Sequence, residues 1–364
     1  MTTLMQASRQ WSTRPDDQRF TSLHALADYV GDQRRNSKSV VVSSRKLEVR
    51  PAASDEIKGL RVHGPNGHGY EPTHWSFGQL ATLAGAPAGY LRTLPAPIAA
   101  DALNYGLKFS RDIEDVGVML RRKDESAEIV AATGPRYGRI WNTAIADNLV
   151  DRFGDGISGD WRVPGEFGRD VTVTKANTTL YASDRDMFVF LADEHNRIQL
   201  PNRRDGKAGS LARGFFVWNS EVGASTIGVA FFLFDYVCCN RIVWGAEGYR
   251  EIKLRHTVSA PDRWLEEVTP VLEQYGEASA RPIEECLQAA QAKKLDDVET
   301  FLKSRFSANI ARKLQNVHET EEGRPIETLW DAATAVTAHA RSIKWQDERV
   351  AMEREGGKLL DLAV

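Results

Sequence analysis

The sequence predicts an α+β fold in which helices flank a mostly antiparallel sheet and a helical C-terminal region follows. Short apolar runs of strand length, separated by turn residues, dominate residues 116–192. The longest apolar stretch, RGFFVWNSEVGASTIGVAFFLFDYVCCNRIVWG at 213–245, predicts two core strands that run into a helix. After Pro261 the chain is rich in Ala, Glu, Lys and Leu, which favours helices. We therefore expect an α+β body over residues 1–261 and an acidic helical region over 262–364.

The first elements alternate between helix and strand. Ser22 is the N-cap of a predicted helix whose apolar residues recur at helical spacing. Polar and apolar residues then alternate over 46–50, which predicts a strand with one face in solvent. A loop rich in Gly, His and Pro follows at 63–74. Three helical patterns come next, and they cover 75–84, about 87–94 and 98–107.

Residues 116–192 predict five strands and one helix. The helix covers 142–153, and the strands are the segments VGVML, EIVAAT, VTVTK, TTLYAS and MFVFLA. A polar, basic segment, IQLPNRRDGKAG, leads from there into the long apolar stretch. Within that stretch Asn219-Ser220-Glu221 predicts a turn between two strands, and Gly223 supplies backbone freedom to the turn.

Charge is divided unevenly along the chain. The 364 residues carry a net charge of −3. Residues 262–364 hold 14 Lys and Arg against 20 Asp and Glu, a net of −6. Residues 1–261 hold 33 against 30, a net of +3. An acidic C-terminal region beside a mildly basic body indicates separate roles for the two parts.

Cysteine content and hydropathy point to an intracellular setting. Three cysteines, two of them adjacent, do not make a disulfide framework. The first 20 residues contain no apolar stretch able to act as a signal peptide. The longest uninterrupted apolar run, 227–234, is far shorter than the roughly 20 residues of a membrane span. We expect a cytoplasmic protein with no membrane partner.

The sequence carries no recognisable motif for a nucleophile or a cofactor. Ser220 lies in Asn-Ser-Glu-Val-Gly, which lacks the Gly-x-Ser-x-Gly elbow of serine hydrolases. Cys238 follows the apolar run FFLFDYV, which favours a buried, inert thiol over a nucleophile activated by Arg241. No Cys-x-x-Cys, phosphate-binding loop or dinucleotide fingerprint occurs. We expect no catalytic residues and no cofactor.

Three histidines share the glycine-rich loop. His63, His68 and His74 stand five and six residues apart, wider than the ligand pairs of known zinc sites. A solvated loop without a metal is therefore favoured. A hydrolase or nuclease that uses Ser220, Glu221 or these histidines stays open as an alternative.

The helical pair FGQLATLAGAPAGYLRTL at 77–94 is similar to a helix-turn-helix DNA-binding unit. Its second helix offers only Tyr90, Arg92 and Thr93 to a DNA groove, where a recognition helix presents several donors and acceptors. A packing hairpin is therefore favoured over sequence-specific reading of DNA.

Basic and aromatic residues recur in the loops and strands of the body. Over 250–256 a strand would place Glu251, Lys253 and Arg255 on one face. Cations along a groove together with aromatic platforms are what a single-stranded nucleic acid requires, and an ordinary solvated sheet surface is the alternative. The candidate nucleic-acid-binding residues are Arg136, Tyr137, Arg139, Arg203, Arg204, Lys207, Trp218, Lys253 and Arg255. Tyr137 and Trp218 would stack on bases, and the cations would contact phosphates.

Four segments carry a resemblance to a known family. They are the stretch at 213–245, HWSFGQLATLAGAPAGYLRTLP, GPRYGRIWN and DMFVFLAD. Together they resemble the phage/plasmid-like protein family, domain of unknown function 932, from about Ser39 to His256. That family is carried by phages, prophages and conjugative plasmids, and it has no established catalytic residues to transfer.

The resemblance implies a setting in the biology of mobile DNA, inside a bacterial host cell. Proteins in that setting often protect or anneal single-stranded DNA. We therefore expect a non-enzymatic single-stranded DNA-binding or annealing protein of DNA metabolism or recombination, with homo-oligomers as a further expectation. The alternatives are a host-directed factor that binds a bacterial protein through its acidic C-terminal helices, and the hydrolase or nuclease described above.

Overall fold

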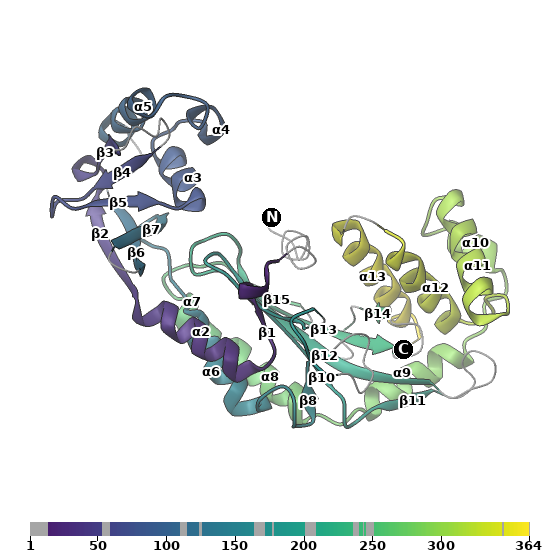
Figure 1. Cartoon of the computed structure of the whole chain (residues 1–364). Coiled ribbons are helices and arrows are strands. Elements are labelled where there is room, and N and C mark those ends of the chain that lie inside the picture. The colour runs from purple at the N-terminus through teal and green to yellow at the C-terminus, as the bar shows by residue number, and fades with distance from the viewer. Residues whose placement is uncertain are drawn as a thin grey trace.

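The fold is α+β, with two mostly antiparallel sheets, flanking helices and a helical C-terminal region, as the sequence predicts. The computed structural model describes residues 14–52, 59–109, 115–123, 126–163, 172–176, 178–200, 209–235, 240–242, 244, 251–343 and 346–363. The molecule is elongated (Figure 1): a small lobe lies at one end, a large sheet forms the centre, and C-terminal helices lie at the other end.

The small lobe is a six-stranded sheet covered by three helices. The strand order is β2 (Ser37–Ser43), β6 (Asp115–Lys123), β7 (Ser126–Thr133), β5 (Gly69–Pro72), β4 (Leu60–His63) and β3 (Glu48–Pro51). The helices are α3 (His74–Leu83), α4 (Ala88–Leu91) and α5 (Ala96–Phe109). Leu80, Leu103 and Ile129 form part of the lobe's core. The three predicted helices are confirmed. The predicted strand is also confirmed, with Val49 buried between exposed Glu48 and Arg50.

The central sheet is built on two long strands, β12 (Gly209–Asn219) and β13 (Ile227–Asp235). They form an antiparallel hairpin in which Phe215 lies opposite Phe231. The remaining strands are β1 (Arg19–Phe20), β8 (Trp161–Arg162), β9 (Leu180–Ala182), β10 (Met187–Asp193), β11 (Ile198–Leu200), β14 (Asn240–Ile242) and β15 (Ile252–Leu254). The main path of the sheet runs β1-β9-β10-β12-β13-β14.

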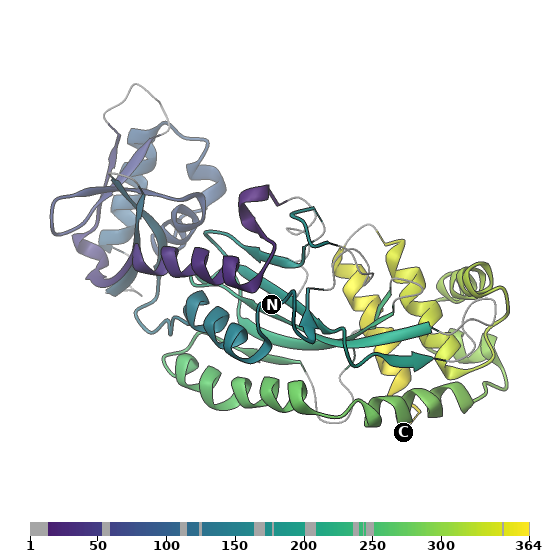
Figure 2. The same ribbon diagram turned by 60° about the horizontal axis from the view of Figure 1, so that its bottom comes forward.

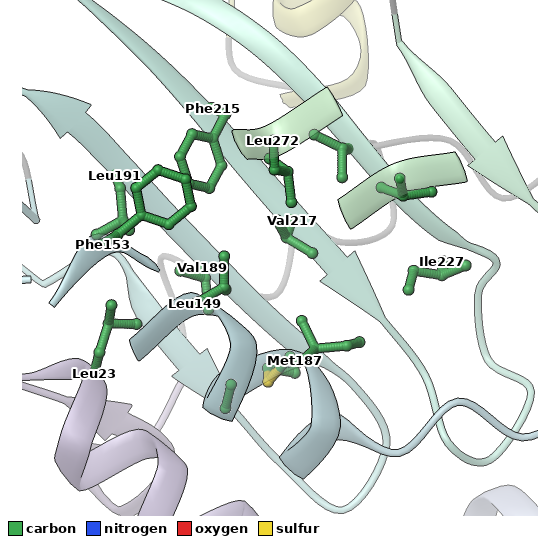
Figure 3. Packing of buried hydrophobic residues seen from close by; sticks show 14 of the residues in the cluster. Leu23, Leu149, Phe153, Met187, Val189, Leu191, Phe215, Val217, Ile227 and Leu272 are labelled. Carbon is green, nitrogen blue, oxygen red and sulfur yellow. The ribbon is translucent and has the colours of Figure 1, made fainter. Parts of the chain in front are cut away.

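Helices cover one face of this sheet. They are α2 (Leu23–Arg35), α6 (Asn142–Phe153), α7 (Ala260–Arg263), a π-helical turn (Trp264–Val268) and α8 (Thr269–Glu277). Figure 3 shows the resulting core, in which Leu23, Leu149 and Leu272 from three different helices pack towards Val189 and Phe215 of the strands. Ser22 caps α2, because its hydroxyl accepts from the Ala25 amide at 3.1 Å.

The opposite face of the same strands is also buried. Its aromatic side chains are Tyr181, Phe188, Phe190, Phe216, Trp218, Phe232 and Phe234, and each is at most 9 % exposed. Since successive residues of a strand point to opposite faces, burial of both faces explains why β12 and β13 are almost uninterrupted apolar runs.

The C-terminal helices pack against the far end of the central sheet. They are α9 (Arg281–Ala292), α10 (Val298–Lys303), α11 (Ala308–Glu322), α12 (Leu329–Arg341) and α13 (Gln346–Leu360). Leu287 and Trp330 share a core with Leu211 and Leu233 of the sheet. Figure 2 shows the green helices lying along one face of the sheet and the yellow helices at its end. The helical region is therefore continuous in its packing with the body.

Three local predictions are wrong. Residues 69–72 of the predicted loop at 63–74 form β5, which pairs with β4 and β7. In the segment VTVTK, residues 172–174 form no regular structure. The hairpin of β12 and β13 does not run directly into a helix, because residues 240–242 form β14, which pairs antiparallel with β13. Cys238 and Cys239 lie outside the described residues. In the described part of the chain, no helix combines the length and the apolar character needed to cross a membrane.

Candidate nucleic-acid interface

The polar interruption of the apolar stretch is the turn between β12 and β13, as predicted. Gly223 adopts a φ of +81°, which favours glycine over residues with a Cβ. The turn is held from the small lobe, because Trp75 Nε1 and Gln79 Nε2 of α3 both donate to the Val222 carbonyl, at 3.0 and 2.7 Å. It therefore lies at the junction of the small lobe and the central sheet.

Glu221 is the buried charge of this turn and is 2 % exposed. Its Oε2 lies 3.3 Å from Nη2 of Arg121, and its Oε1 accepts from the Asn142 amide at 2.7 Å. The second contact caps the N-terminus of α6, where the helix dipole stabilises negative charge. Burial raises the pKa of Glu221, and Arg121 and the Asn142 amide oppose that rise. The carboxyl group thus joins the small lobe, the turn and α6.

A stack of alternating cations and aromatic rings lies beside Glu221. The Arg34 guanidinium lies 4.0 Å from the centroid of the Trp141 ring, and Arg139 lies 5.7 Å from the same ring. Arg139 is also 5.3 Å from the Tyr137 ring, which stacks on His256 at 4.8 Å. The Arg139 guanidinium donates to the Glu221 carbonyl. This stack, defined as Arg34, Trp141, Arg139, Tyr137 and His256, is a cation–π arrangement.

Burial within the stack shifts three pKa values. It raises the pKa of Tyr137 above the usual range and lowers that of Arg139. It also lowers the pKa of His256 to about 4, and the positive charge of Arg139 acts in the same direction. Each shift disfavours the charged form of a desolvated group. At neutral pH His256 is therefore uncharged, and the cations of the stack are arginines.

The structure brings together two of the predicted basic segments, 136–139 and 253–256. The Gly138 amide donates to the His256 carbonyl at 3.1 Å. The backbones approach so closely that a Cβ at Gly138 would lie 1.7 Å from the Thr257 carbonyl oxygen. Arg136 and Arg255 are both exposed in this region, and neither has an acidic partner within salt-bridge distance in the described ranges.

Lys253 lies on β15 and is exposed, between the buried Leu254 and the partly buried Ile252. This is the alternation that the sequence predicts. Its ammonium group pairs with Glu251 at 3.0 Å, so part of its charge is already neutralised.

Tyr137 donates its hydroxyl hydrogen to the Ser220 carbonyl at 2.8 Å, which fixes the ring on the surface of the turn.

Trp218 lies elsewhere, within the aromatic face of the central sheet, and is 1 % exposed. Its ring covers Gly228 on the next strand, where a Cβ would lie 2.0 Å from Cζ2. A base has no access to this ring, so the prediction that Trp218 stacks on bases does not fit its burial. The predicted cations Arg203, Arg204 and Lys207 lie outside the described residues.

Sequence reasoning missed Arg34 and Trp141. Arg34 is one of several charged residues near the end of a helix, and nothing local distinguishes it. Trp141 directly precedes α6 in the segment GPRYGRIWN, so its closeness to Arg136 and Tyr137 was a usable signal. The stack itself is a tertiary feature.

Ser220 and His63, which the hydrolase alternative would use, both make hydrogen-bonding contacts with the backbone. Ser220 Oγ donates to the Arg185 carbonyl at 2.6 Å and accepts from the Ala224 amide at 2.9 Å. His63 Nδ1 lies 3.2 Å from the Gly67 carbonyl oxygen. Among the described residues, no group of three or more His, Cys, Asp or Glu side chains could hold a metal ion.

The fold thus defines an α+β protein whose two sheets meet at a buried ionic junction. Residues 169–354 match the family model described as a domain of unknown function (DUF932). The chain belongs to this family. The matched segment includes the central sheet from β9 onward and most of the C-terminal helices, but not the segments HWSFGQLATLAGAPAGYLRTLP and GPRYGRIWN that also carried the resemblance. No curated protein and no solved structure matches the chain.

Proposed function

We propose that the protein binds single-stranded DNA, without catalysing a reaction, on the surface around Arg136, Lys253 and Arg255. The proposal rests on the contact between the loop at 134–139 and the strand end at 253–257. This contact brings exposed cations from two distant segments of the chain close together. Cations along such a surface contact the phosphates of a single-stranded nucleic acid.

The stack supports this proposal because it fixes the backbone that carries Arg136. Tyr137 and Arg139 are held by the turn and by His256. The adjacent cation is therefore presented from a rigid element, which lowers the entropy lost on binding. Arg34 is exposed at the end of the stack that is farthest from His256. It extends the positive surface towards the end of α2.

Under this proposal the protein acts in the cytoplasm of a bacterium that carries a phage or plasmid, in DNA metabolism or recombination. Annealing of complementary strands is the activity that would follow from binding, since strands held through their phosphates keep their bases free to pair. Phosphate contacts carry no sequence information, so binding should be insensitive to base sequence.

The test is equilibrium binding of the full chain to a fluorescent single-stranded oligonucleotide and to its duplex, over a series of salt concentrations. We expect preference for the single strand and affinity that falls steeply with salt. Arg136→Ala and Arg255→Ala should each reduce the salt slope by about 0.7, the value for one phosphate contact on a single strand. Arg281→Ala is the matched control, because this exposed arginine lies on α9 and pairs with Glu285.

The outcomes separate the function from its location. No binding at low salt by folded protein refutes the proposed function. If binding is unchanged in both variants, the DNA binds to another surface of the protein. Equal losses for Arg281→Ala and the two test variants would mean that only overall charge matters, and the proposed surface would then be wrong.

A further inference from the structure

Helix α5 of the small lobe carries apolar residues on two faces. One face is buried in the lobe and includes Leu103 and Leu107. The other is exposed: Ile98 is 55 % exposed, Tyr105 70 % and Phe109 67 %. Tyr105 and Phe109 contact each other, with ring centroids 5.1 Å apart. Three large apolar side chains on one exposed helix face are uncommon in a monomer and mark an interaction surface.

The exposed residues have the spacing of a coiled-coil seam. Ile98, Ala102, Tyr105 and Phe109 are separated by four, three and four residues, which are alternating d and a positions of a heptad. Ala102 is partly exposed between the larger side chains. In the heptad frame set by these four residues, Asp101 and Lys108 both occupy g positions, and both are exposed.

Two copies of α5 that pack in antiparallel orientation would place complementary residues opposite each other. The register that places Ile98 opposite Phe109 of a second helix also places Ala102 opposite Tyr105, so the large ring meets the small side chain. In antiparallel pairs the g positions of the two helices lie on the same side. Asp101 then lies about 3 Å along the axis from the partner copy's g-position lysine, within reach of its side chain. A two-fold axis generates this contact twice.

A parallel pairing lacks this complementarity. It would set the g positions against the e positions, which are Ala99 and Gly106. Both are buried against the body of the small lobe. The charges of α5 therefore favour an antiparallel partner with the same sequence.

We propose that α5 is the interface of a two-fold symmetric homodimer, formed by antiparallel packing of Ile98, Ala102, Tyr105 and Phe109 against the same residues of a second copy. The contact is small. Three large side chains that each bury roughly 100–150 Å² give roughly 600–900 Å² over the two copies, below the roughly 1,200 Å² of standard interfaces. The dimer should therefore be weak, with dissociation at micromolar concentrations, and its formation depends on the amount of protein.

The test is sedimentation equilibrium of the full chain over a concentration series from about 1 to 200 μM, chosen to span a micromolar Kd. Asp101→Lys places like charges together at both symmetric contacts and should raise Kd about tenfold. Adding Lys108→Asp reverses both charges, restores opposite signs and should recover most of the affinity. Leu265→Ala, which alters another exposed apolar residue (58 % exposed) beside α7, should have no effect.

Tyr105→Ala tests the apolar contact separately and should also raise Kd at least tenfold. All the altered side chains are exposed, so thermal unfolding should change little, and a large fall in Tm would identify a misfolded sample. The pKa of Glu48 is lowered by its hydrogen bond with Arg50 and, to a lesser extent, by the charge of Lys108. Because Lys108→Asp also changes the surroundings of Glu48, Tm of the double variant is compared with that of each single variant. A monomer at every concentration overturns the proposal. So does a Kd that is unchanged in Tyr105→Ala, or a Kd that the second charge reversal fails to lower again.

Discussion

His256 should make the stability of the protein depend on pH in the acidic range. Its ring stacks on Tyr137, its Nδ1 donates to the Gly138 carbonyl at 3.0 Å, and burial together with the charge of Arg139 lowers its pKa from 6.5 to about 4. As pH falls through 6.5, the unfolded chain binds a proton at His256 while the folded protein does not. The contribution of His256 to stability is therefore complete above pH 6.5 and is lost as pH falls towards 4.

The size of the loss follows from the two pKa values. A difference of one pKa unit corresponds to about 1.4 kcal/mol, so a fall from 6.5 to about 4 corresponds to about 3 kcal/mol in full. Most of this loss is reached by pH 4.5. It is a large fraction of the roughly 5–15 kcal/mol that stabilises a typical protein, so the effect should be measurable.

The measurement compares urea unfolding of the protein and of His256→Asn at pH 7, 6, 5 and 4.5. The asparagine amide can still donate to the Gly138 carbonyl, but it cannot be protonated in this range. At pH 7 the variant should be less stable because the stacking on Tyr137 is lost, and the difference should shrink or reverse towards pH 4.5. Subtraction of the two curves removes the contribution of all other titrating groups. Parallel curves would refute the reasoning, because His256 would then have the same pKa in both states.

Two further predictions concern the junction and the central sheet. Glu221→Gln leaves Arg121 buried without its counter-charge and should lower the free energy of unfolding by roughly 3 kcal/mol; a loss below 0.5 kcal/mol in urea titrations would mean that the ion pair is not stabilising. Gly228→Ala forces a Cβ into the Trp218 ring and should cost about 1–3 kcal/mol by the same method. Gly89→Ala, where a Cβ meets nothing, is its control, and similar losses for both would contradict the packing argument.

The local elements of the fold were predictable because their signals are local. The helix at 142–153 and the cap at Ser22 come from periodicity and from one hydroxyl. The turn at Asn219-Ser220-Glu221 was predictable because it interrupts two apolar runs. Segment 172–174 was mispredicted because alternation of Val and Thr favours a strand only where a partner strand is present.

The burial of Trp218 could have been predicted. It ends the run GFFVW, in which residues of both strand faces are apolar, and such runs belong to strands covered on both sides. The aromatic residue type of Trp218 favours a stacking platform, whereas the apolar pattern around it predicts burial. Arg34 and Trp141, in contrast, meet only in the folded chain, and no spacing in the sequence connects them.

The candidate interface is formed by residues from both sides of the family boundary. The turn with Glu221 and the strand end with Arg255 lie within the matched segment 169–354, whereas Arg121 and the loop with Arg136 lie before it. A fragment limited to the matched segment would leave the Glu221 carboxylate without Arg121 and would uncover the sheet face packed by α2 and α6. Removal of residues 262–364 would likewise expose that face, because Trp264 and Leu272 pack on it. Neither truncation separates binding from folding, so single substitutions in the full chain are the informative experiments.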